Sequence, residues 1–384
     1  MVALGIDQLM SHHHALIADK RLGLITNYAM TDAHLLPVID RLQRDRSTCL
    51  VRLFGPEHGV RNAAKEGDAV IDAVDAHSGL PAVSLYGVMK APSPDMLSDL
   101  DVLVIDLQDI GSRYYTNAST LYHALESAAQ AHIRVVVLDR PNPIGGVRRE
   151  GHVLDPAYQS FVGMLPVPIR HGLTFAEEAR LIQSMFFPQI QLEVVPMQGW
   201  TRSMLFPDTG LPFVSPSPNT TGFDMTLLYC GTCLFEGTNV SVGRGTTHPF
   251  EWIGAPWVDG HQLADWFNAQ HLAGVKARPV YFTPWRSLYA GDLVQGVQLH
   301  VVAAQQVHSL KVGVTLLNAF CMLYPQSFQI QTNEDGARPF FDLLAGGSQL
   351  RECIESGRTA EYFAQEPDVI AQFEKDIAPY LLYV

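Results

Sequence analysis

Apolar runs of strand length alternate with segments of helical spacing over the first 200 residues. The runs at 101–106 and 134–139 are almost continuously apolar, which is typical of central strands in a parallel sheet buried on both faces. Asp32 suits the N-cap of a first helix, and Thr174 with Glu177 suits a capping box at a later one. The remaining predicted elements are strands at 21–27, 48–54, 82–86 and 192–196, and helices at 32–42, 116–131 and 174–187. This alternation predicts an α/β fold with a Rossmann-like, doubly wound, mostly parallel sheet.

The pattern changes in the second half of the chain. Residues 199–245 are rich in Pro, Gly, Ser, Thr and Asn, as in a long, ordered loop. Beyond about residue 246, helices are predicted at 259–271, 309–324 and 360–380, and a strand at 296–302. We therefore expect a Rossmann-like catalytic domain at 1–240 and a second, smaller α+β domain at 241–384.

Polar side chains follow the predicted strands of the first half. They are Asn27, Glu57, His58, Asp106, Asp109, Asp139 and Arg140. Ligands of open α/β sheets bind outside the carboxyl ends of the strands, so these side chains mark the expected binding edge. No GxGxxG motif follows the first strand, which leaves a dinucleotide site without support. We expect no cofactor.

Composition and charge narrow the classes of molecule that we expect the protein to bind. The formal net charge is −13 and no large cluster of Lys and Arg is present, which argues against nucleic acid and against polyanions bound by charge alone. No run of 18 apolar residues occurs, so no membrane span is predicted. The first residues do not read as a signal peptide, which predicts a cytoplasmic protein if the chain is complete, and a periplasmic or secreted one if an export signal was removed. A small-molecule substrate is the remaining expectation, and the oligomeric state stays open.

The cysteine and histidine patterns give no metal site. Cys230 and Cys233 have CxxC spacing, which would suit a redox pair or half a zinc site, but no second CxxC completes it. Their apolar flanks favour structural thiols in a buried segment. Residues 12–14 are three adjacent histidines, and adjacent residues do not share a helix face. We expect no bound metal.

Glu57 is the leading candidate for catalysis. It follows Gly55 and Pro56, so the chain must turn sharply and present the carboxyl group at the sheet edge. A carboxylic acid in a partly apolar cleft can donate a proton near neutral pH, and Phe54 and Tyr86 could supply the apolar wall. His58 could orient the carboxyl group. The structural alternative is that Glu57 caps a helix that begins near His58.

Other candidates carry a structural alternative of their own. Carboxylates, an arginine and adjacent aromatics suit sugar recognition, whereas Asp106 could instead cap a helix and pair with Arg113. Asp139 and Asn142 could bind substrate or hold a turn, and His171 could be a site residue or a structural one. Glycines near Glu236 could let the backbone approach a ligand or serve turn geometry. The candidates are Asp106, Asp109, Arg113, Tyr115, Asp139, Arg140, Asn142, Glu150, His171, Glu236, Asn239 and Arg244.

Ordered motifs over the full length carry a resemblance to a known family. They occur at 54–59, 84–87, 106–111, 139–146, 170–172, 208–212, 217–219, 236–239, 243–247, 249–251 and 254–257. With these motifs the chain closely resembles the NamZ-type exo-β-N-acetylmuramidases, also known as DUF1343. The resemblance implies a Rossmann-like catalytic domain, an auxiliary domain and a cleft between them. It also implies removal of terminal N-acetylmuramic acid from the non-reducing end of peptidoglycan fragments, with Glu57 as the catalytic glutamate and Asn219 among the substrate contacts.

Two positions depart from the family pattern. Asn117 stands where an aromatic residue is expected, and Thr220-Thr221 stands where Met-Pro is expected. Both departures concern the substrate cleft, so they bear on the preferred chain length and peptide decoration.

Glycosidase chemistry assigns roles to these residues. Glu57 would protonate the glycosidic oxygen, and a second carboxylate would attack the anomeric carbon or activate water. Glu236 is the first choice for that partner, with Asp106 or Glu150 as alternatives. Arg113, Arg140 or Arg244 could bind the lactyl carboxylate of muramic acid, because a guanidinium matches a carboxylate bidentately. A non-catalytic muropeptide-binding protein or sensor is the alternative function, and the missing phosphate loop weakens a nucleotide-dependent enzyme.

Overall fold

A seven-stranded sheet forms the frame of the first half of the chain in the computed structural model, which describes residues 1–64, 73–87, 89–332 and 337–384. The strand order is β3-β4-β2-β1-β5-β6-β7, and all neighbours are parallel except β3 and β4. The strands are β1 (Arg21–Ile25), β2 (Cys49–Gly55), β3 (Ala73–Val74), β4 (Pro81–Ser84), β5 (Val102–Ile105), β6 (Arg134–Leu138) and β7 (Leu192–Val195). The predicted doubly wound sheet is confirmed.

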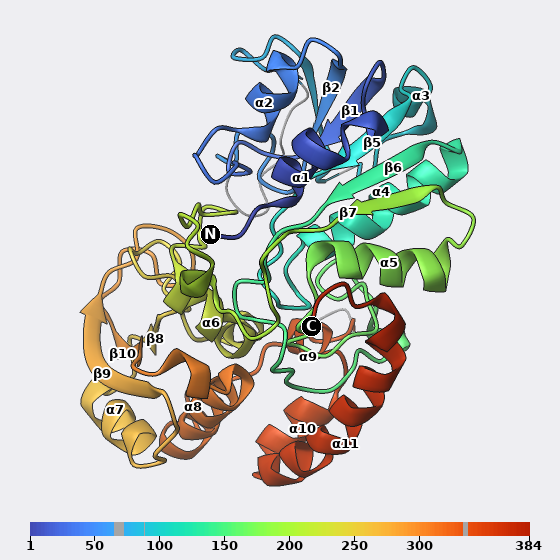
Figure 1. The fold of residues 1–384 in the computed structure, drawn as a ribbon. Coiled ribbons are helices and arrows are strands. Elements are labelled where there is room, and N and C mark those ends of the chain that lie inside the picture. The colour runs from blue at the N-terminus through green and yellow to red at the C-terminus, as the bar shows by residue number, and fades with distance from the viewer. Residues whose placement is uncertain (65–72, 88, 333–336) are drawn as a thin grey trace.

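Helices cover both faces of this sheet (Figure 1). In β5, Leu103 and Ile105 pack toward α4 (Asn117–Ala131) and α5 (Phe175–Phe186), while Val102 and Val104 pack toward α1 (Gly5–His12) and α2 (Val38–Arg44). Because successive side chains of a strand point to opposite faces, a strand covered on both sides must be apolar throughout. The short helix α3 (Pro94–Leu97) lies before β5.

The predicted start of the helix at Asp32 is wrong. The Asp32 carboxylate accepts hydrogen bonds from the backbone N–H groups of His34 (2.8 Å) and Leu36 (3.0 Å), which close a turn. Leu35 has φ of +64° in this turn, and α2 begins only at Val38, after Pro37. By contrast, the capping box of Thr174 and Glu177 at α5 is confirmed.

A second unit contains a three-stranded antiparallel sheet of order β8-β10-β9. Its strands are β8 (Trp252–Ala255), β9 (Val275–Phe282) and β10 (Val294–Val301). Its helices are α6 (Phe223–Thr232), α7 (Gly260–Asn268), α8 (Ser309–Leu323), α9 (Phe340–Ala345) and α10 (Gln349–Glu355). Helix α6 lies within the stretch predicted as loop, and it packs closely on α8. The predicted boundary at residue 240 stays a prediction.

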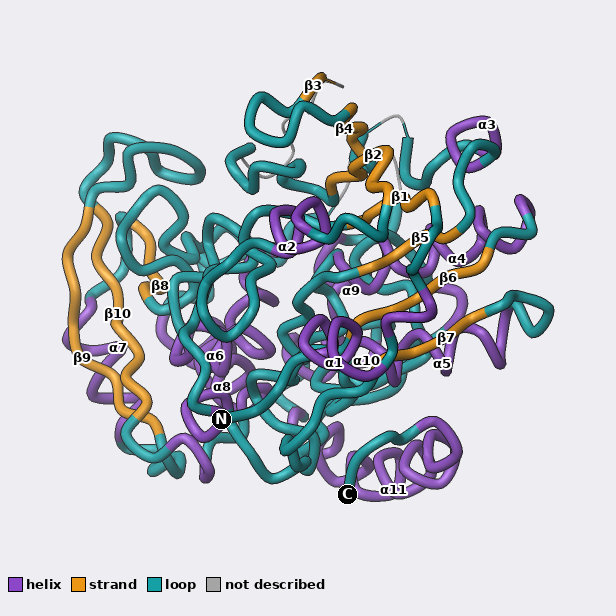
Figure 2. The backbone as a smooth tube through the Cα atoms, turned by 45° about the horizontal axis from the view of Figure 1, so that its top comes forward, coloured by secondary structure: helices purple, strands orange, loops and turns teal. Residues whose placement is uncertain are grey.

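The C-terminal helix α11 (Thr359–Ile377) returns to the first unit (Figures 1 and 2). Phe373 and Ile377 of α11 join the apolar core beneath α5, and Arg180 of α5 donates a hydrogen bond to the carbonyl of Tyr380. Tyr383 donates a hydrogen bond to the Asp139 carboxylate at the end of β6. The end of the chain therefore ties the second unit back to the large sheet. Among the described residues, no helix has the length and apolarity needed to cross a membrane.

Candidate active site

A cavity of about 450 Å³ lies at the carboxyl end of β2 and reaches across to the second unit. Residues from both units line it, among them Glu57 and Tyr86 from the first, and Glu236 and Arg244 from the second. A volume of this size is typical of small-molecule sites. The cavity is therefore the candidate active site.

Glu57 is presented by a tight turn at the end of β2. The Gly59 N–H donates to the Pro56 carbonyl at 2.8 Å, and Gly59 has φ of +71°, a conformation that favours glycine. Glu57 therefore lies in a turn and does not cap a helix. Its Oε2 accepts a hydrogen bond of 2.7 Å from Thr116 Oγ1. His58 also lines the cavity, but its Nδ1 lies 2.8 Å from the Ala64 carbonyl oxygen, within its own turn.

Glu236 and Arg244 form an ion pair in the wall contributed by the second unit. Arg244 Nε lies 2.5 Å from Glu236 Oε1, and the guanidinium packs 4.9 Å from the ring centroid of Phe250. The second oxygen of Glu236 lies 3.4 Å from Cys233 Sγ. The short helix of residues 233–237 that follows α6 positions Glu236.

Aromatic rings make up much of the remaining lining. Tyr86 and Phe161 pack with their centroids 5.9 Å apart, and Tyr229 contacts both Tyr115 (6.5 Å) and Phe250 (4.7 Å) edge to face. Burial raises the pKa of Tyr115 above its usual value, so its hydroxyl stays neutral. Such walls suit a ligand with apolar faces and hydroxyl groups, as sugars have.

Of the residues expected at the binding edge or in the site, eight line the cavity. They are Asn27, Glu57, His58, Tyr86, Tyr115, Asn219, Glu236 and Arg244. The two departures from the family pattern also reach it, through Asn117 and Thr220. The sequence reasoning missed Thr116 and Phe161, although the position of Thr116 at the start of a predicted helix beside two tyrosines was a usable signal.

Three of the expected arginine and acid candidates form buried ion pairs or backbone contacts outside the cavity lining. Asp106 pairs with Arg140 across β5 and β6, at 3.0 Å between Oδ2 and Nη2. Arg113 donates to the carbonyls of His152, Val167 and Leu344, and burial lowers its pKa to about 10. Arg113 therefore does not pair with Asp106.

The other expected residues outside the lining have structural contacts as well. Glu150 pairs with Arg170 at 2.7 Å. Asp139 accepts hydrogen bonds from Thr174 Oγ1 (2.8 Å) and from the N–H of Ala176 (2.9 Å). Asn142 donates to the Leu173 carbonyl, and Asn239 donates to that of Ser327. None of these partners lines the cavity, so the contacts belong to the surrounding framework.

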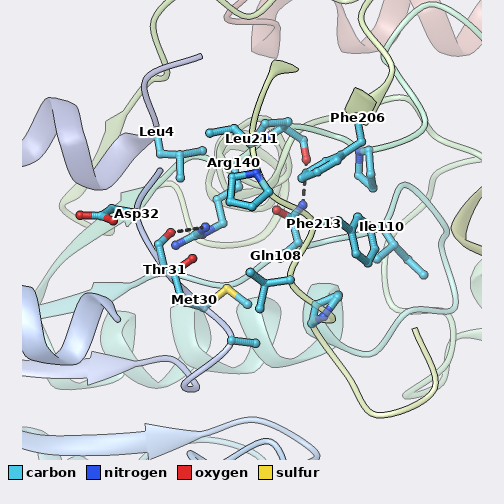
Figure 3. A pocket seen from close by; sticks show the side chains of 16 residues that line it. Leu4, Met30, Thr31, Asp32, Gln108, Ile110, Arg140, Phe206, Leu211 and Phe213 are labelled. Atoms are coloured by element: carbon cyan, nitrogen blue, oxygen red, sulfur yellow. Dashed lines mark hydrogen bonds between the residues drawn. The ribbon is translucent and has the colours of Figure 1, made fainter. Parts of the chain in front are cut away.

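A smaller cavity adjoins the site at the same edge of the sheet (Figure 3). It measures about 30 Å³, enough for a water molecule, and Arg140, Gln108 and Asp32 are among its polar residues. Arg140 donates a hydrogen bond of 3.0 Å to the Thr31 carbonyl there. Pro216 lines both cavities, so the two are neighbours.

Asp109, His171 and Glu178 form a fully buried cluster with the residue types of a metal site. His171 Nε2 lies 3.3 Å from Asp109 Oδ2 and 3.3 Å from Glu178 Oε1. However, His171 Nδ1 accepts a hydrogen bond of 3.1 Å from the Leu173 N–H, so a neutral ring carries its proton on Nε2. A protonated Nε2 cannot bind a cation. Burial and the charges of Asp109, Asp139 and Glu177 raise the pKa of Glu178 well above its usual value, so this carboxyl group keeps its proton to higher pH than an exposed glutamate does.

The CxxC cysteines are buried free thiols, and Cys233 is among the residues that line the cavity. Cys230 is on α6, and Cys233 begins the short helix that carries Glu236. Burial raises the pKa of Cys230 to about 12 and raises that of Cys233 as well. Thiols of this kind are poor nucleophiles, since the thiolate is the reactive form.

Two family models together span most of the chain. Exo-beta-N-acetylmuramidase NamZ, N-terminal, matches residues 22–224, and the corresponding C-terminal model matches residues 227–383. The chain belongs to the NamZ family. This membership confirms the predicted family and the predicted class of enzyme, a glycoside hydrolase.

Similar proteins agree with this assignment to the NamZ family. The peptidoglycan beta-N-acetylmuramidase NamZ of Bacillus subtilis (strain 168) is 42% identical over 383 residues, which is 100% of this chain and 91% of the relative. Two crystal structures of DUF1343 family proteins from Bacteroides fragilis match 100% of this chain and 99% of theirs. Their TM-scores are 0.91 and 0.76, at 35% and 28% identity.

Proposed function

We propose that this protein removes N-acetylmuramic acid from the non-reducing end of peptidoglycan fragments, with Glu57 as the general acid. The observation that carries this proposal is the place of Glu57, at a strand end in a cavity of about 450 Å³ that also contains a second carboxylate and aromatic walls. The family supplies the substrate class. The reaction would serve the turnover or recycling of cell-wall fragments.

Glu57 protonates the oxygen of the scissile bond as the sugar develops positive charge at its anomeric carbon. The bond to the leaving sugar then breaks, and the proton leaves with the new hydroxyl group. Thr116 already donates to Oε2 of Glu57, so the Oε1 side is the one that can face the glycosidic oxygen.

Glu236 is our candidate for the second carboxylate, which attacks the anomeric carbon or activates water. The two alternatives are less suitable, because Asp106 and Glu150 are fully buried in ion pairs with Arg140 and Arg170 and neither lines the cavity. Glu236 lines it together with Glu57.

Arg244 is our candidate for binding the lactyl carboxylate that distinguishes muramic acid from other amino sugars. Of the three arginines considered, Arg244 lines the cavity, whereas Arg113 and Arg140 are bound to backbone carbonyls and to Asp106 outside it. Its side chain is held by Glu236 and Phe250, which limits the entropy lost when a ligand binds.

The test compares two substrates in the parent enzyme and in the Glu57→Gln and Glu236→Gln variants. One is a disaccharide of N-acetylmuramic acid linked to N-acetylglucosamine, and the other is an aryl glycoside of N-acetylmuramic acid. An aryloxide leaves without much help from an acid, so loss of a general acid slows the disaccharide far more than the aryl glycoside.

We expect Glu57→Gln to lower kcat on the disaccharide by about 10²–10⁴-fold, with a smaller loss on the aryl glycoside. Glu236→Gln should slow both substrates, since its role is at the anomeric carbon. Glu361→Gln, which alters an exposed pair with Arg358, is the control and should be unaffected. Full activity of Glu57→Gln on the disaccharide would overturn the assignment. Saturable binding without product in the parent would instead indicate a binding protein.

A further inference from the structure

Thr116 and Glu57 are joined by a side-chain hydrogen bond inside the cavity. Thr116 Oγ1 lies 2.7 Å from Glu57 Oε2, and both residues line the cavity although they lie 59 positions apart in the sequence. Thr116 immediately precedes α4, and its carbonyl accepts the Thr120 N–H at 3.0 Å, the first turn of that helix. A rigid helix start therefore holds the hydroxyl group against one oxygen of the carboxyl group.

The direction of this bond follows from the two groups. A threonine hydroxyl has one proton to donate, and an ionised carboxylate only accepts. When Glu57 is protonated, donation by Thr116 to Oε2 leaves Oε1 as the oxygen that carries the transferable proton. When Glu57 has lost that proton, the same bond stabilises the negative charge that remains, and the positive end of α4 lies beside it.

We infer that Thr116 is the positioning residue of the general acid, which fixes the transferable proton on Glu57 Oε1 and stabilises the carboxylate left after transfer. This inference rests on the proposed function of Glu57. Thr116 itself does not touch the reacting bond in this scheme, because it acts through Oε2. The free energy of a hydrogen bond to a charged group corresponds to a rate change of roughly 10–100-fold when the bond stabilises the transition state.

The test uses Thr116→Val, which keeps the shape and removes the hydroxyl group, and Thr116→Ser, which keeps the hydroxyl group. Thr120→Val is the matched control, because it removes a buried hydroxyl one turn along α4 whose hydrogen bond goes to the Thr116 carbonyl. Each variant is assayed on the disaccharide and on the aryl glycoside across pH. Thermal unfolding is followed in parallel, and Thr116→Ala replaces Thr116→Val if the latter does not fold.

We expect Thr116→Val to lower kcat on the disaccharide by roughly 10–100-fold, with KM changed less than about threefold and a smaller loss on the aryl glycoside. The basic limb of its pH–rate profile should move to higher pH, because removal of a donor disfavours the ionised carboxylate. Thr116→Ser should restore most of the rate and the original limb. Thr120→Val should retain the parent profile.

Two results would overturn the inference. One is a Thr116→Val enzyme with the rate and the pH limbs of the parent. If Glu57→Gln is inactive in the same assay, the proposed function stands and only the role of Thr116 is lost. The other is equal loss on both substrates with unmoved limbs and no recovery in Thr116→Ser, as a merely structural role would give. An active Glu57→Gln enzyme, by contrast, would remove the proposed function itself.

Discussion

Arg244 Nε lies 2.5 Å from Glu236 Oε1, and this pair shares one cavity with Glu57. Phe250 supports the guanidinium from one face at 4.9 Å. A guanidinium carries five N–H donors and matches a carboxylate bidentately, so an arginine in the cavity wall suits a ligand that carries a carboxylate. Glu236 can therefore act in two ways, as a reacting carboxylate and as the partner that orients Arg244. Substitution of Arg244 tests the second role.

Arg244→Gln should weaken binding of substrates that carry the lactyl carboxylate. We expect KM for the aryl glycoside of N-acetylmuramic acid to rise about 10–100-fold, because a charge-assisted pair in a partly buried site is lost. The aryl glycoside of N-acetylglucosamine lacks the lactyl group, so its kcat/KM should change much less. Arg358→Gln, at an exposed position, is the control. Equal losses on both glycosides would contradict the role of Arg244 in recognising the carboxylate.

The seven-stranded sheet could be predicted because its central strands are recognisable from their own residues, as short and almost continuously apolar runs. Val104 and Ile105 lie in a run that is apolar on both faces, and such a run has few alternatives to a central parallel strand. The edge at which ligands bind then follows from topology, which is why Glu57 could be singled out. Helix α6 gave no such signal, because it is apolar on every side and therefore lacks a helical period.

The partners of the charged residues could not be predicted from their order in the chain. Asp106 and Arg140 lie 34 positions apart in the sequence and meet because β5 and β6 are neighbours. Arg113 is nearer to Asp106 in the sequence, but its guanidinium donates hydrogen bonds to backbone carbonyls instead. Whether a strand-end carboxylate faces a cavity or a buried arginine depends on such tertiary pairs. The sequence therefore predicted the edge of the sheet, but not which of its side chains line the cavity.

Glu150→Gln should destabilise the fold in a pH-dependent way. Burial alone would raise the pKa of Glu150, but the Arg170 guanidinium and other partners outweigh burial and hold it at about 2. Because this folded-state pKa lies below the ordinary value of 4.5, the stabilisation is present above pH 4.5 and is lost as pH falls toward 2. The variant also leaves Arg170 buried without its charged partner, which costs about 3–5 kcal/mol.

Denaturant unfolding at pH 7 and pH 3 measures this effect. The difference between parent and Glu150→Gln should be largest at pH 7 and smaller at pH 3. Glu361→Gln, in a pair with Arg358 that is exposed on both sides, should differ from the parent by less than about 1 kcal/mol at both values. A difference for Glu150→Gln that is independent of pH would contradict the linkage.

Glu178→Gln should stabilise the protein near neutral pH. Burial, followed by the charges of Asp109, Asp139 and Glu177, raises the pKa of Glu178 well above its usual value of 4.5. The folded chain then retains a proton that the unfolded chain releases above pH 4.5, so stability falls as pH rises. A neutral glutamine removes this penalty, and we expect a gain in the free energy of unfolding at pH 7 that vanishes below pH 4.5.

The neighbouring Glu177→Gln is the contrasting control, since Glu177 pairs with Arg202 at 2.7 Å and its loss should destabilise. A chelator should leave the melting temperature of the parent unchanged, because the proton on His171 Nε2 opposes metal binding at this cluster. A lower melting temperature with chelator, or a destabilised Glu178→Gln protein, would indicate a metal there instead.

Gly313→Ala should disrupt the packing of α8 against α6. Helix α6 and the short helix that follows it supply part of the cavity wall. Helices α6 and α8 approach so closely at Gly231 and Gly313 that a Cβ atom on Gly313 would lie 2.2 Å from the Gly231 carbonyl oxygen. The backbone of α6 cannot yield there as a flexible side chain would. Although alanine favours a helix over glycine by about 1 kcal/mol, we expect the clash to exceed this gain and destabilise the fold by about 1–3 kcal/mol.

Displacement of α6 should also reduce activity, because Tyr229 on α6 and Glu236 just beyond it both line the cavity. Gly222→Ala, which changes the residue before the same helix where a Cβ atom meets nothing within 4 Å, is the matched control. Thermal unfolding and kcat/KM on the disaccharide should both fall for Gly313→Ala and stay near the parent for Gly222→Ala. Parent-like stability of Gly313→Ala would mean that the two helices can separate without loss, and that their close approach does not set the geometry of the wall.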